Sequence, residues 1–360
     1  MRTLIKNAKV VTAEKVIKGC VAYTDGIIDY VGADEVAADE IIDAEGGYLV
    51  PGFIDIHCHG CMGMDTMDDV PLDEMARFQL RNGTTTWYPT TMTMPVEDII
   101  RATSRNTEIE DGASIPGFHL EGPFINEKYK GAQNPDYIIE PSKALTEKCK
   151  RAAMITVAPE IDGSLVFAEN SELIVSVGHT DADYDTAKRA FERGARCLTH
   201  TFNAMNGIHH RAPGPILAAA EAEGVYAQVI SDGLHVHPAA VRMLIKLFGD
   251  ERIILISDSM AATGFDDGEY SFGGMPIIVK DGVARTLSGS LAGSTTTLFG
   301  CVRKLISFGI SAERAVKMAT ENPARLMGLN KGSIEIGYDA DFIVVDDDFN
   351  LIRAIARGEF

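Results

Sequence analysis

Residues 48–60 of the chain read Tyr-Leu-Val-Pro-Gly-Phe-Ile-Asp-Ile-His-Cys-His-Gly. The run from Phe53 is largely apolar, which predicts a buried strand ending at His57. Because successive side chains of a strand point to opposite faces, His57 and His59 project to one side and Cys58 to the other. Two imidazoles side by side at a strand end suit a divalent metal ion, although two hydrogen-bonded histidines would also fit this short stretch.

The same pattern recurs through the middle of the chain: an apolar stretch, a polar residue at its end, and often an amphipathic stretch after it. Strands are predicted at residues 53–57, 84–90, 115–121, 153–159, 173–179, 196–200, 225–232 and 253–258. Helices are predicted at residues 71–82, 95–107, 183–193, 215–223 and 238–248. Eight strands alternating with helices are typical of an α/β fold, here a parallel (β/α)8 TIM-like barrel with right-handed crossovers.

Both ends of the chain read instead as short strands separated by turns, at residues 4–11, 20–24, 27–31, 332–337 and 341–346. Neither end can bury a core alone, so we expect residues 1–50 and 330–360 to pack together as a small β-sandwich domain. Residues 51–329 then form the barrel, with a β insertion near 266–290. Helices at 295–308, 312–320 and 323–329 lead from this insertion to the tail.

Charge and apolar patterning exclude several classes of protein. The formal net charge is −19 and no basic run occurs, which argues against binding to nucleic acid or to an anionic membrane surface. No apolar stretch is long enough to span a membrane, and the N-terminus lacks a signal-peptide core. The 6 cysteines show no disulfide-like spacing, and Cys58 and Cys61 lack the second pair of a zinc ribbon. We therefore expect a cytoplasmic protein.

The predicted strand ends carry a set of side chains that bind metals. In a barrel of this type the active site lies at the C-terminal mouth of the strands. The polar residues at those ends are His57, His59, Glu121, His179, His200 and Asp258. Buried histidines placed by chance would not all fall at one mouth, so the sequence predicts a metal site there.

Imidazoles and carboxylates without thiolates suit zinc or iron, with manganese or cobalt as other candidates. An ion with an open coordination position lowers the pKa of a bound water towards about 7 and polarises a substrate carbonyl, which is the chemistry of amide hydrolysis. Asp258, at the end of an apolar strand, is the candidate for the general base that passes a proton to the leaving nitrogen. An N-cap or a plain ligand role is the alternative for Asp258.

Motifs along nearly the whole chain, in order, resemble the amidohydrolase superfamily and, within it, the deacetylases of N-acetylglucosamine 6-phosphate. The superfamily signals are residues 51–59 (Pro-Gly-Phe-Ile-Asp-Ile-His-Cys-His) and 337–345 (Gly-Tyr-Asp-Ala-Asp-Phe-Ile-Val-Val). The more specific signals are residues 119–124, 177–180, 199–205, 209–214, 257–260 and 289–294. The resemblance implies hydrolysis of N-acetylglucosamine 6-phosphate to glucosamine 6-phosphate and acetate.

The resemblance also implies roles for the strand-end residues. Glu121, His179 and His200 match the main metal ligands of these deacetylases, and Asp258 matches the catalytic carboxylate. His57 and His59 match a pair that completes a second metal site in some members, so one or two ions are expected per subunit. Many amidohydrolases bridge two metals with a carbamylated lysine on the fourth strand. Residues 153–159 contain no lysine, so the bridging role would pass to Glu121.

For the substrate, a phosphorylated amino sugar, the resemblance implies contacts from several loops. The matching residues are Asn203, Ala204, Arg211, His235, Leu291, Ala292 and Gly293. The guanidinium of Arg211 suits a phosphate, because it offers paired donors and stays charged, although a surface loop arginine is the alternative. Gln133 stands where some members have a histidine that touches the substrate. A glutamine amide can donate and accept there but carries no proton at neutral pH.

Other interpretations remain open from the sequence alone. An N-acyl amino-acid deacetylase or a dihydroorotase-like enzyme would share the barrel and the metal but would not need Arg211. A deaminase lacks a recognisable motif here, and a non-catalytic scaffold on the same fold would be expected to have lost ligands. His119 is interpreted as supporting the ligands, and His237 as structural, while the roles of His209 and His210 are undecided. A homodimer or homotetramer is expected.

Overall fold

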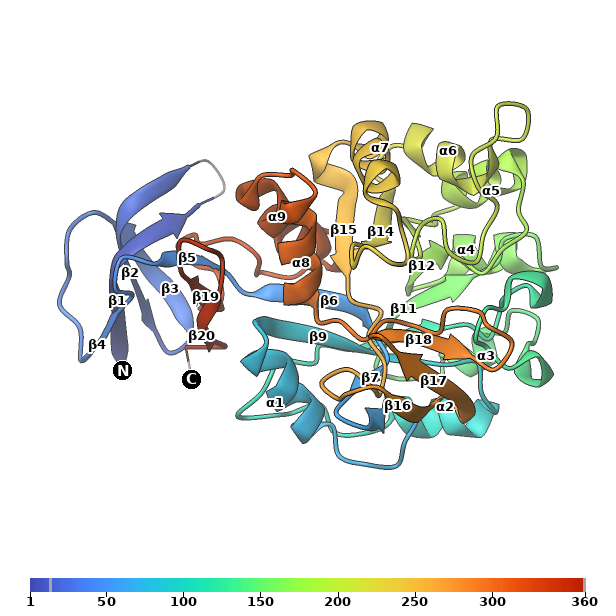
Figure 1. Ribbon diagram of the computed structural model, residues 1–360, viewed down its shortest axis with the longest axis horizontal. Helices are drawn as coiled ribbons and strands as arrows, with labels where there is room; N and C mark the ends of the chain where they lie inside the picture. Colours follow the sequence, from blue (N-terminus) through green and yellow to red (C-terminus); the bar gives the residue numbers. More distant parts are fainter. Residues whose placement is uncertain (13–14, 359–360) are drawn as a thin grey trace.

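The computed structural model describes residues 1–12 and 15–358, which form an α/β barrel and a smaller sheet domain beside it (Figure 1). The fold class predicted for the barrel is confirmed, because eight parallel strands lie in the order β6-β9-β10-β11-β12-β13-β14-β15. Their bounds are β6 Phe53–Cys58, β9 Thr84–Thr91, β10 Phe118–Glu121, β11 Ala152–Val157, β12 Ile174–Val177, β13 Cys197–Leu198, β14 Tyr226–Ile230 and β15 Ile253–Ile256. The backbone N–H of Asp258 donates to the carbonyl of His57 across 2.9 Å, which brings β15 against β6 and nearly closes the barrel.

A helix follows each barrel strand. These helices are α1 Asp73–Arg81, α2 Val96–Thr103, α3 Lys143–Thr146, α4 Ser164–Asn170, α5 Tyr184–Glu192, α6 Gly214–Glu221, α7 Pro238–Phe248 and α8 Leu298–Ser307. The sequence did not predict α3 and α4, because they have only 4 and 7 residues and show no clear apolar stripe. No helix in the described ranges is long and apolar enough to cross a lipid bilayer.

Three of the barrel strands that were predicted to end at a metal ligand stop two residues before that ligand. Those residues are His179 after β12, His200 after β13 and Asp258 after β15. Their backbone φ angles are 47°, 27° and 49°, which lie in the left-handed region that strands do not adopt. The chain therefore turns at each of these residues.

The small domain is a seven-stranded sheet built from both ends of the chain (Figure 1). Its order is β20-β19-β5-β1-β2-β3, and β4 pairs with β1. The bounds are β1 Arg2–Val11, β2 Val16–Thr24, β3 Ile27–Gly32, β4 Glu40–Asp43, β5 Tyr48–Pro51, β19 Phe342–Val345 and β20 Leu351–Ile355. Residues 332–337 form turns instead of the predicted strand, since Gly332 and Gly337 have φ angles of 83° and 91°. After α8, the helices α9 Ala312–Ala319 and α10 Glu321–Met327 lead back to this sheet.

The predicted insertion is a three-stranded antiparallel sheet of β16 Gly268–Phe272, β17 Met275–Lys280 and β18 Val283–Thr286. It reaches the barrel mouth, because the ring of Phe272 lies edge-on to His59 with 5.0 Å between ring centroids. A short hairpin of β7 Gly60–Cys61 and β8 Met64–Asp65 also follows β6. Short 3-10 helices lie at η1 Glu127–Tyr129, η2 Pro135–Tyr137 and η3 Asp250–Arg252.

Candidate metal centre and substrate cavity

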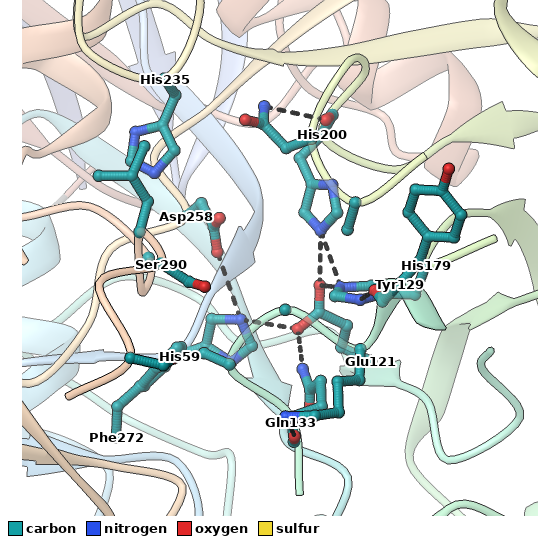
Figure 2. A pocket seen from close by; sticks show the side chains of 18 of the residues that line it. His59, Glu121, Tyr129, Gln133, His179, His200, His235, Asp258, Phe272 and Ser290 are labelled. Carbon is teal, nitrogen blue, oxygen red and sulfur yellow. Dashed lines mark hydrogen bonds and ion pairs between the residues drawn. The ribbon is translucent and has the colours of Figure 1, made fainter. Parts of the chain in front are cut away.

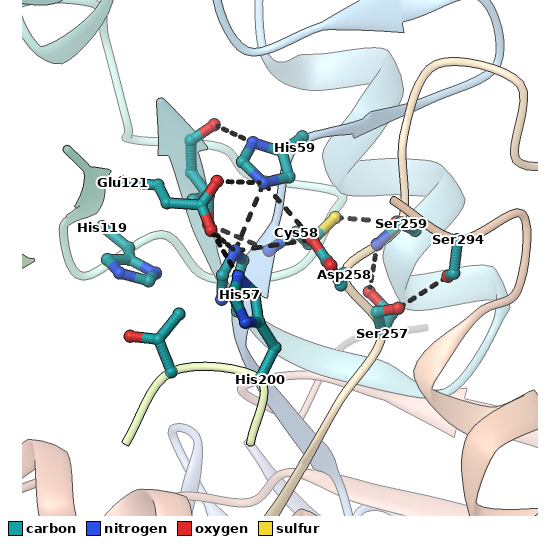
Figure 3. A network of polar contacts seen from close by, with 12 residues as sticks. His57, Cys58, His59, His119, Glu121, His200, Ser257, Asp258, Ser259 and Ser294 are labelled. Atoms are coloured by element: carbon teal, nitrogen blue, oxygen red, sulfur yellow. Dashed lines mark hydrogen bonds and ion pairs between the residues drawn. The ribbon is translucent and has the colours of Figure 1, made fainter. Parts of the chain in front are cut away.

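The six predicted metal-binding residues lie together at the carboxyl ends of the barrel strands, and all are buried. They form two groups: His57, His59 and Asp258 in one, and Glu121, His179 and His200 in the other. Within each group the donor atoms lie within 4.8 Å of one another. Strands far apart in the sequence thus supply one cluster, as Figure 3 shows for five of the six side chains.

The ring tautomers follow from the hydrogen bonds on the far side of each imidazole. His179 Nδ1 lies 2.8 Å from the Tyr129 carbonyl and His59 Nδ1 lies 3.2 Å from the Thr90 carbonyl. A carbonyl oxygen can only accept, so both Nδ1 atoms carry the proton. In its neutral form each ring therefore presents the Nε2 lone pair to the cluster, as metal ligation requires.

His57 is held in the same way by Gln228, a polar residue in the middle of β14. The backbone N–H of His200 donates to Gln228 Oε1 across 3.3 Å, which identifies this atom as the oxygen. His57 Nδ1 lies 3.1 Å from the same oxygen and therefore donates to it. One buried amide thus contacts a residue from each donor group.

The Nε2 atoms lie so close to one another that a cation is needed between them. His179 and His200 Nε2 lie 3.1 Å apart, and they lie 3.1 and 3.0 Å from Glu121 Oε1 (Figure 2). His57 and His59 Nε2 lie 3.2 Å apart, and they lie 3.4 and 3.3 Å from Asp258 Oδ1. Lone pairs this close repel one another unless a proton or a metal ion lies between them, so the donor set fits divalent ions.

Glu121 lies between the two groups. Its Oε1 is 3.3 Å from His57 Nε2, in addition to its contacts with His179 and His200. Its Oε2 is 3.2 Å from His59 Nε2 (Figures 2 and 3). A carboxylate in this place can serve two ions, which suits the bridging role expected in the absence of a lysine on the fourth strand.

The donors change one another's protonation when no ion is bound. Burial lowers the pKa of the His59 imidazole, but its contacts with Asp258 and Glu121 outweigh burial and raise that pKa to about 10. Burial raises the pKa of Glu121, but nearby imidazoles, first that of His57, outweigh burial and hold it well below its usual range. The cluster therefore favours added positive charge, as protons or as metal ions.

His119 lies beneath the cluster and belongs to neither donor group. Its Nε2 is 2.8 Å from the hydroxyl of Thr156, and its ring lies edge-on to His57 with 4.6 Å between centroids (Figure 3). Burial lowers the pKa of His119 well below its usual value, so the ring is neutral. This position suits the supporting role expected for His119.

A cavity of about 540 Å³ opens beside the cluster. Of the predicted substrate contacts, the residues that line it are Gln133, Asn203, Ala204, His235, Leu291 and Gly293. Ala292 is fully buried and does not line the cavity. Phe272 from the insertion forms part of the wall, and sequence reasoning missed it.

Arg211 does not line this cavity. Its side chain is exposed, and its guanidinium lies 2.7 Å from Nε2 of His210. The lysines that line the cavity are Lys128 and Lys130, and Lys128 is paired with Asp181 at 2.8 Å. His209 accepts from the backbone N–H of Arg211 across 3.3 Å, so His209 and His210 shape this loop. His237 caps α7 by accepting from the N–H of Ala239 across 3.1 Å, a structural contact.

Besides Phe272, two residues with evident roles were missed from the sequence. Gln228 is a polar residue in an otherwise apolar strand, and that pattern is the signal that would have found it. Asp232 ends the predicted seventh strand and contacts His235, but it was not recognised as a partner of that histidine. Each contacts a residue that the motifs had identified: Gln228 contacts His57, and Asp232 contacts His235.

Comparison with known proteins gives a consistent set of relatives. The sequence pattern of the amidohydrolase family matches residues 48–360 of this chain. The N-acetylglucosamine-6-phosphate deacetylase of Bacillus subtilis (strain 168) is 36% identical, covering 99% of this chain and 96% of the relative. The N-acetylgalactosamine-6-phosphate deacetylase of Escherichia coli O157:H7 is 34% identical, covering 93% of this chain and 92% of the relative.

A solved structure gives the same result for the fold. It is a mutant N-acetyl-D-glucosamine-6-phosphate deacetylase from Mycobacterium smegmatis in complex with N-acetyl-D-glucosamine-6-phosphate. The TM-score is 0.92 at 33% sequence identity, and the match covers 99% of this chain and 98% of that chain. The similarity thus includes both the barrel and the small sheet domain.

Proposed function

Because this chain belongs to the amidohydrolase family, we propose that it hydrolyses the acetamide of N-acetylglucosamine 6-phosphate to glucosamine 6-phosphate and acetate. The observation that carries the proposal is the pair of buried donor groups at the edge of one cavity, with Glu121 between them. Relatives with this activity in their names match nearly the whole chain.

The metal ligands we propose are Glu121, His179 and His200 for one divalent ion, and His57, His59 and Asp258 for a second. Zinc and iron are the first candidates for these nitrogen and oxygen donors, followed by manganese and cobalt. When bound, such an ion supplies an acidified water and a Lewis acid for the amide carbonyl. The protein contributes the orientation of the donors, through Gln228, Thr90 and Tyr129 behind the rings.

Asp258 is the proposed general base and acid. Its carboxylate is buried, lines the cavity and lies at the cluster, so it can reach a water that attacks the carbonyl carbon. It accepts one proton from that water as the carbon–oxygen bond forms. It then delivers the proton to the amide nitrogen as the carbon–nitrogen bond breaks. This releases the free amine and acetic acid, which gives its remaining proton to the solvent and becomes acetate.

The proposed substrate contacts are Gln133, Asn203, Ala204, Arg211, His235, Leu291, Ala292 and Gly293. Support is strongest for Asn203, Ala204, His235, Leu291 and Gly293, because they line the cavity. Arg211 remains the proposed phosphate ligand on the chemistry of its guanidinium. For Gln133 and Ala292 the proposed part is to shape the wall, since the Gln133 amide is engaged by protein groups and Ala292 is buried.

A second substrate is favoured by one comparison. The Escherichia coli O157:H7 relative is named for N-acetylgalactosamine 6-phosphate, and it is nearly as similar to this chain as the Bacillus subtilis one. The two sugars differ only in the configuration of one ring hydroxyl. The N-acyl amino-acid deacetylase, dihydroorotase-like and scaffold interpretations are not favoured.

The test is acetate release by the purified, metal-loaded protein. We expect turnover of N-acetylglucosamine 6-phosphate at least about tenfold above that of N-acetylated amino acids, with N-acetylgalactosamine 6-phosphate measured beside it. Elemental analysis of the same preparation gives the identity and number of the ions. No acetate release from either sugar phosphate by a fully metallated protein would contradict the proposal.

We also propose a cytoplasmic homodimer or homotetramer. The 6 cysteines are all free and buried, which suits a reducing compartment. On α7, Met243 and Leu247 lie one turn apart and are 40% and 36% exposed, which gives an apolar surface for a second copy. Light scattering of the protein as it elutes from a size-exclusion column measures the oligomer size.

A further inference from the structure

We propose that Asp232 is a positioning residue for His235: it holds the imidazole through Nδ1 so that Nε2 faces the substrate in the cavity. This inference rests on the proposed function, because it concerns the same cavity. His235 was expected to contact the substrate, whereas Asp232 had no role assigned to it.

The Asp232 carboxylate is bound on both oxygens by the turn that carries the histidine. Its Oδ1 accepts from the backbone N–H groups of Leu234 and His235 across 2.8 and 2.9 Å. Its Oδ2 lies 2.7 Å from His235 Nδ1. Both side chains are only 6% exposed. The carboxylate therefore cannot turn away from the ring without leaving two backbone donors unpaired.

This contact decides which ring nitrogen faces the cavity. Nδ1 faces a carboxylate and so carries the proton, which leaves Nε2 as the ring nitrogen free for the cavity that His235 lines. Figure 2 shows the His235 ring on the same side of the pocket as Asp258. Burial lowers the pKa of the His235 imidazole, but the Asp232 carboxylate outweighs burial and raises that pKa.

The place of Asp232 also matters for the charge that the substrate meets. The chain carries a formal charge of −19, and Glu121, Glu127 and Asp258 all line the cavity. Asp232 does not line it, so its negative charge lies behind the ring while Nε2 faces the cavity. A substrate in this cavity thus meets the imidazole and not the carboxylate that holds it.

The competing explanation is that Asp232 only stabilises the turn, through its bonds to the N–H groups of Leu234 and His235. A double-mutant cycle separates the two roles. The variants are Asp232→Asn, His235→Ala and the double variant, with Asp162→Asn as the control. Asp162 is exposed and lies outside the cavity lining, and its substitution removes the same charge.

If Asp232 acts through His235, each single substitution raises KM for N-acetylglucosamine 6-phosphate about tenfold or more, and the double variant is no worse than His235→Ala. The kcat and the metal content change little, Asp162→Asn behaves as wild type, and Asp232→Glu restores part of the loss. Independent effects that multiply in the double variant, or an unchanged KM in Asp232→Asn, would overturn the inference.

A second measurement does not depend on turnover. Nitrogen-15 NMR of the histidine rings, with the His235→Ala variant for assignment, reports whether His235 carries a proton on Nδ1, and whether inorganic phosphate shifts Nε2. We expect a protonated Nδ1 in the wild type and its loss in Asp232→Asn. If the enzyme released no acetate but this signature were present, the proposed function would fail while the positioning by Asp232 would stand. A wild-type ring without a proton on Nδ1 would refute the positioning directly.

Discussion

Gln133 donates a hydrogen bond to Glu121 Oε2 across 2.5 Å while its own carbonyl accepts from the backbone N–H of Thr93 across 2.6 Å. Because that N–H can only donate, the amide cannot be flipped, and its NH2 group must face the carboxylate. Both polar atoms of Gln133 are thus engaged by the protein. Gln133 lines the cavity, as a predicted substrate contact should, and it also orients the carboxylate between the two donor groups.

Substituting Gln133 by Ala should therefore weaken metal retention more than substrate binding. Loss of a partner that holds a metal ligand typically lowers metal affinity about 10- to 100-fold. The measurement is the ion content after dialysis against graded chelator, together with KM for the metal-saturated enzyme. A raised KM with normal metal retention would show that Gln133 acts on the substrate and not through Glu121.

Asp258→Asn should lower kcat by about 100-fold or more, because the amide cannot accept and return a proton. The side chain keeps its shape and one oxygen donor, so we expect the His179 group to stay metallated. Rates are to be compared at equal metal content, with Asp162→Asn as the charge-matched control. Near-normal turnover would remove Asp258 from the proton transfer.

Arg211→Ala should raise KM for N-acetylglucosamine 6-phosphate about tenfold or more and leave the unphosphorylated sugar unaffected, if the guanidinium holds phosphate. Arg193 is a suitable control, because it is a surface arginine paired with Glu169 at 2.8 Å. Lys130→Ala belongs in the same series, since Lys130 does line the cavity. Similar losses on both sugars would argue against a phosphate role for Arg211.

Removing the metal should change how stability depends on pH. In the metal-free protein the His59 pKa is raised to about 10, above the ordinary histidine value of about 6.5. Its contribution to the free energy of unfolding is thus complete below about pH 6.5 and is lost as the pH rises towards about 10. Thermal melts of the chelated protein from pH 6 to 9 measure this, with the metal-loaded protein as reference. A melting temperature of the metal-free protein that rose with pH would contradict it.

The same protonation predicts proton release on metal binding near neutral pH, because an imidazole must lose its Nε2 proton to bind an ion. Calorimetric titration with zinc in two buffers of different ionisation enthalpy counts the protons released. Binding without proton release would show that the rings are already neutral.

The sequence predicted the parts of this fold that local pattern decides. The apolar run over residues 53–57 identified the first barrel strand, observed at Phe53–Cys58, and the polar strand ends identified all six residues of the donor groups. The polar contacts in the loops were not predictable, because they depend on backbone turns far apart in the sequence. Such turns bring Gln133 to Glu121 and place Arg211 away from the cavity.

The backbone at His179, His200 and Asp258 is left-handed, and all three residues belong to the donor groups. Stability and catalysis therefore place opposite demands on these positions. Each such conformation costs a residue with a Cβ of order 1 kcal/mol, and glycine or asparagine would relieve that cost. Selection for stability alone would thus favour replacements that remove a donor side chain. In ancestral or laboratory lineages without selection for turnover, we expect these three residues to be replaced early. The protein should become more heat-resistant as they are replaced.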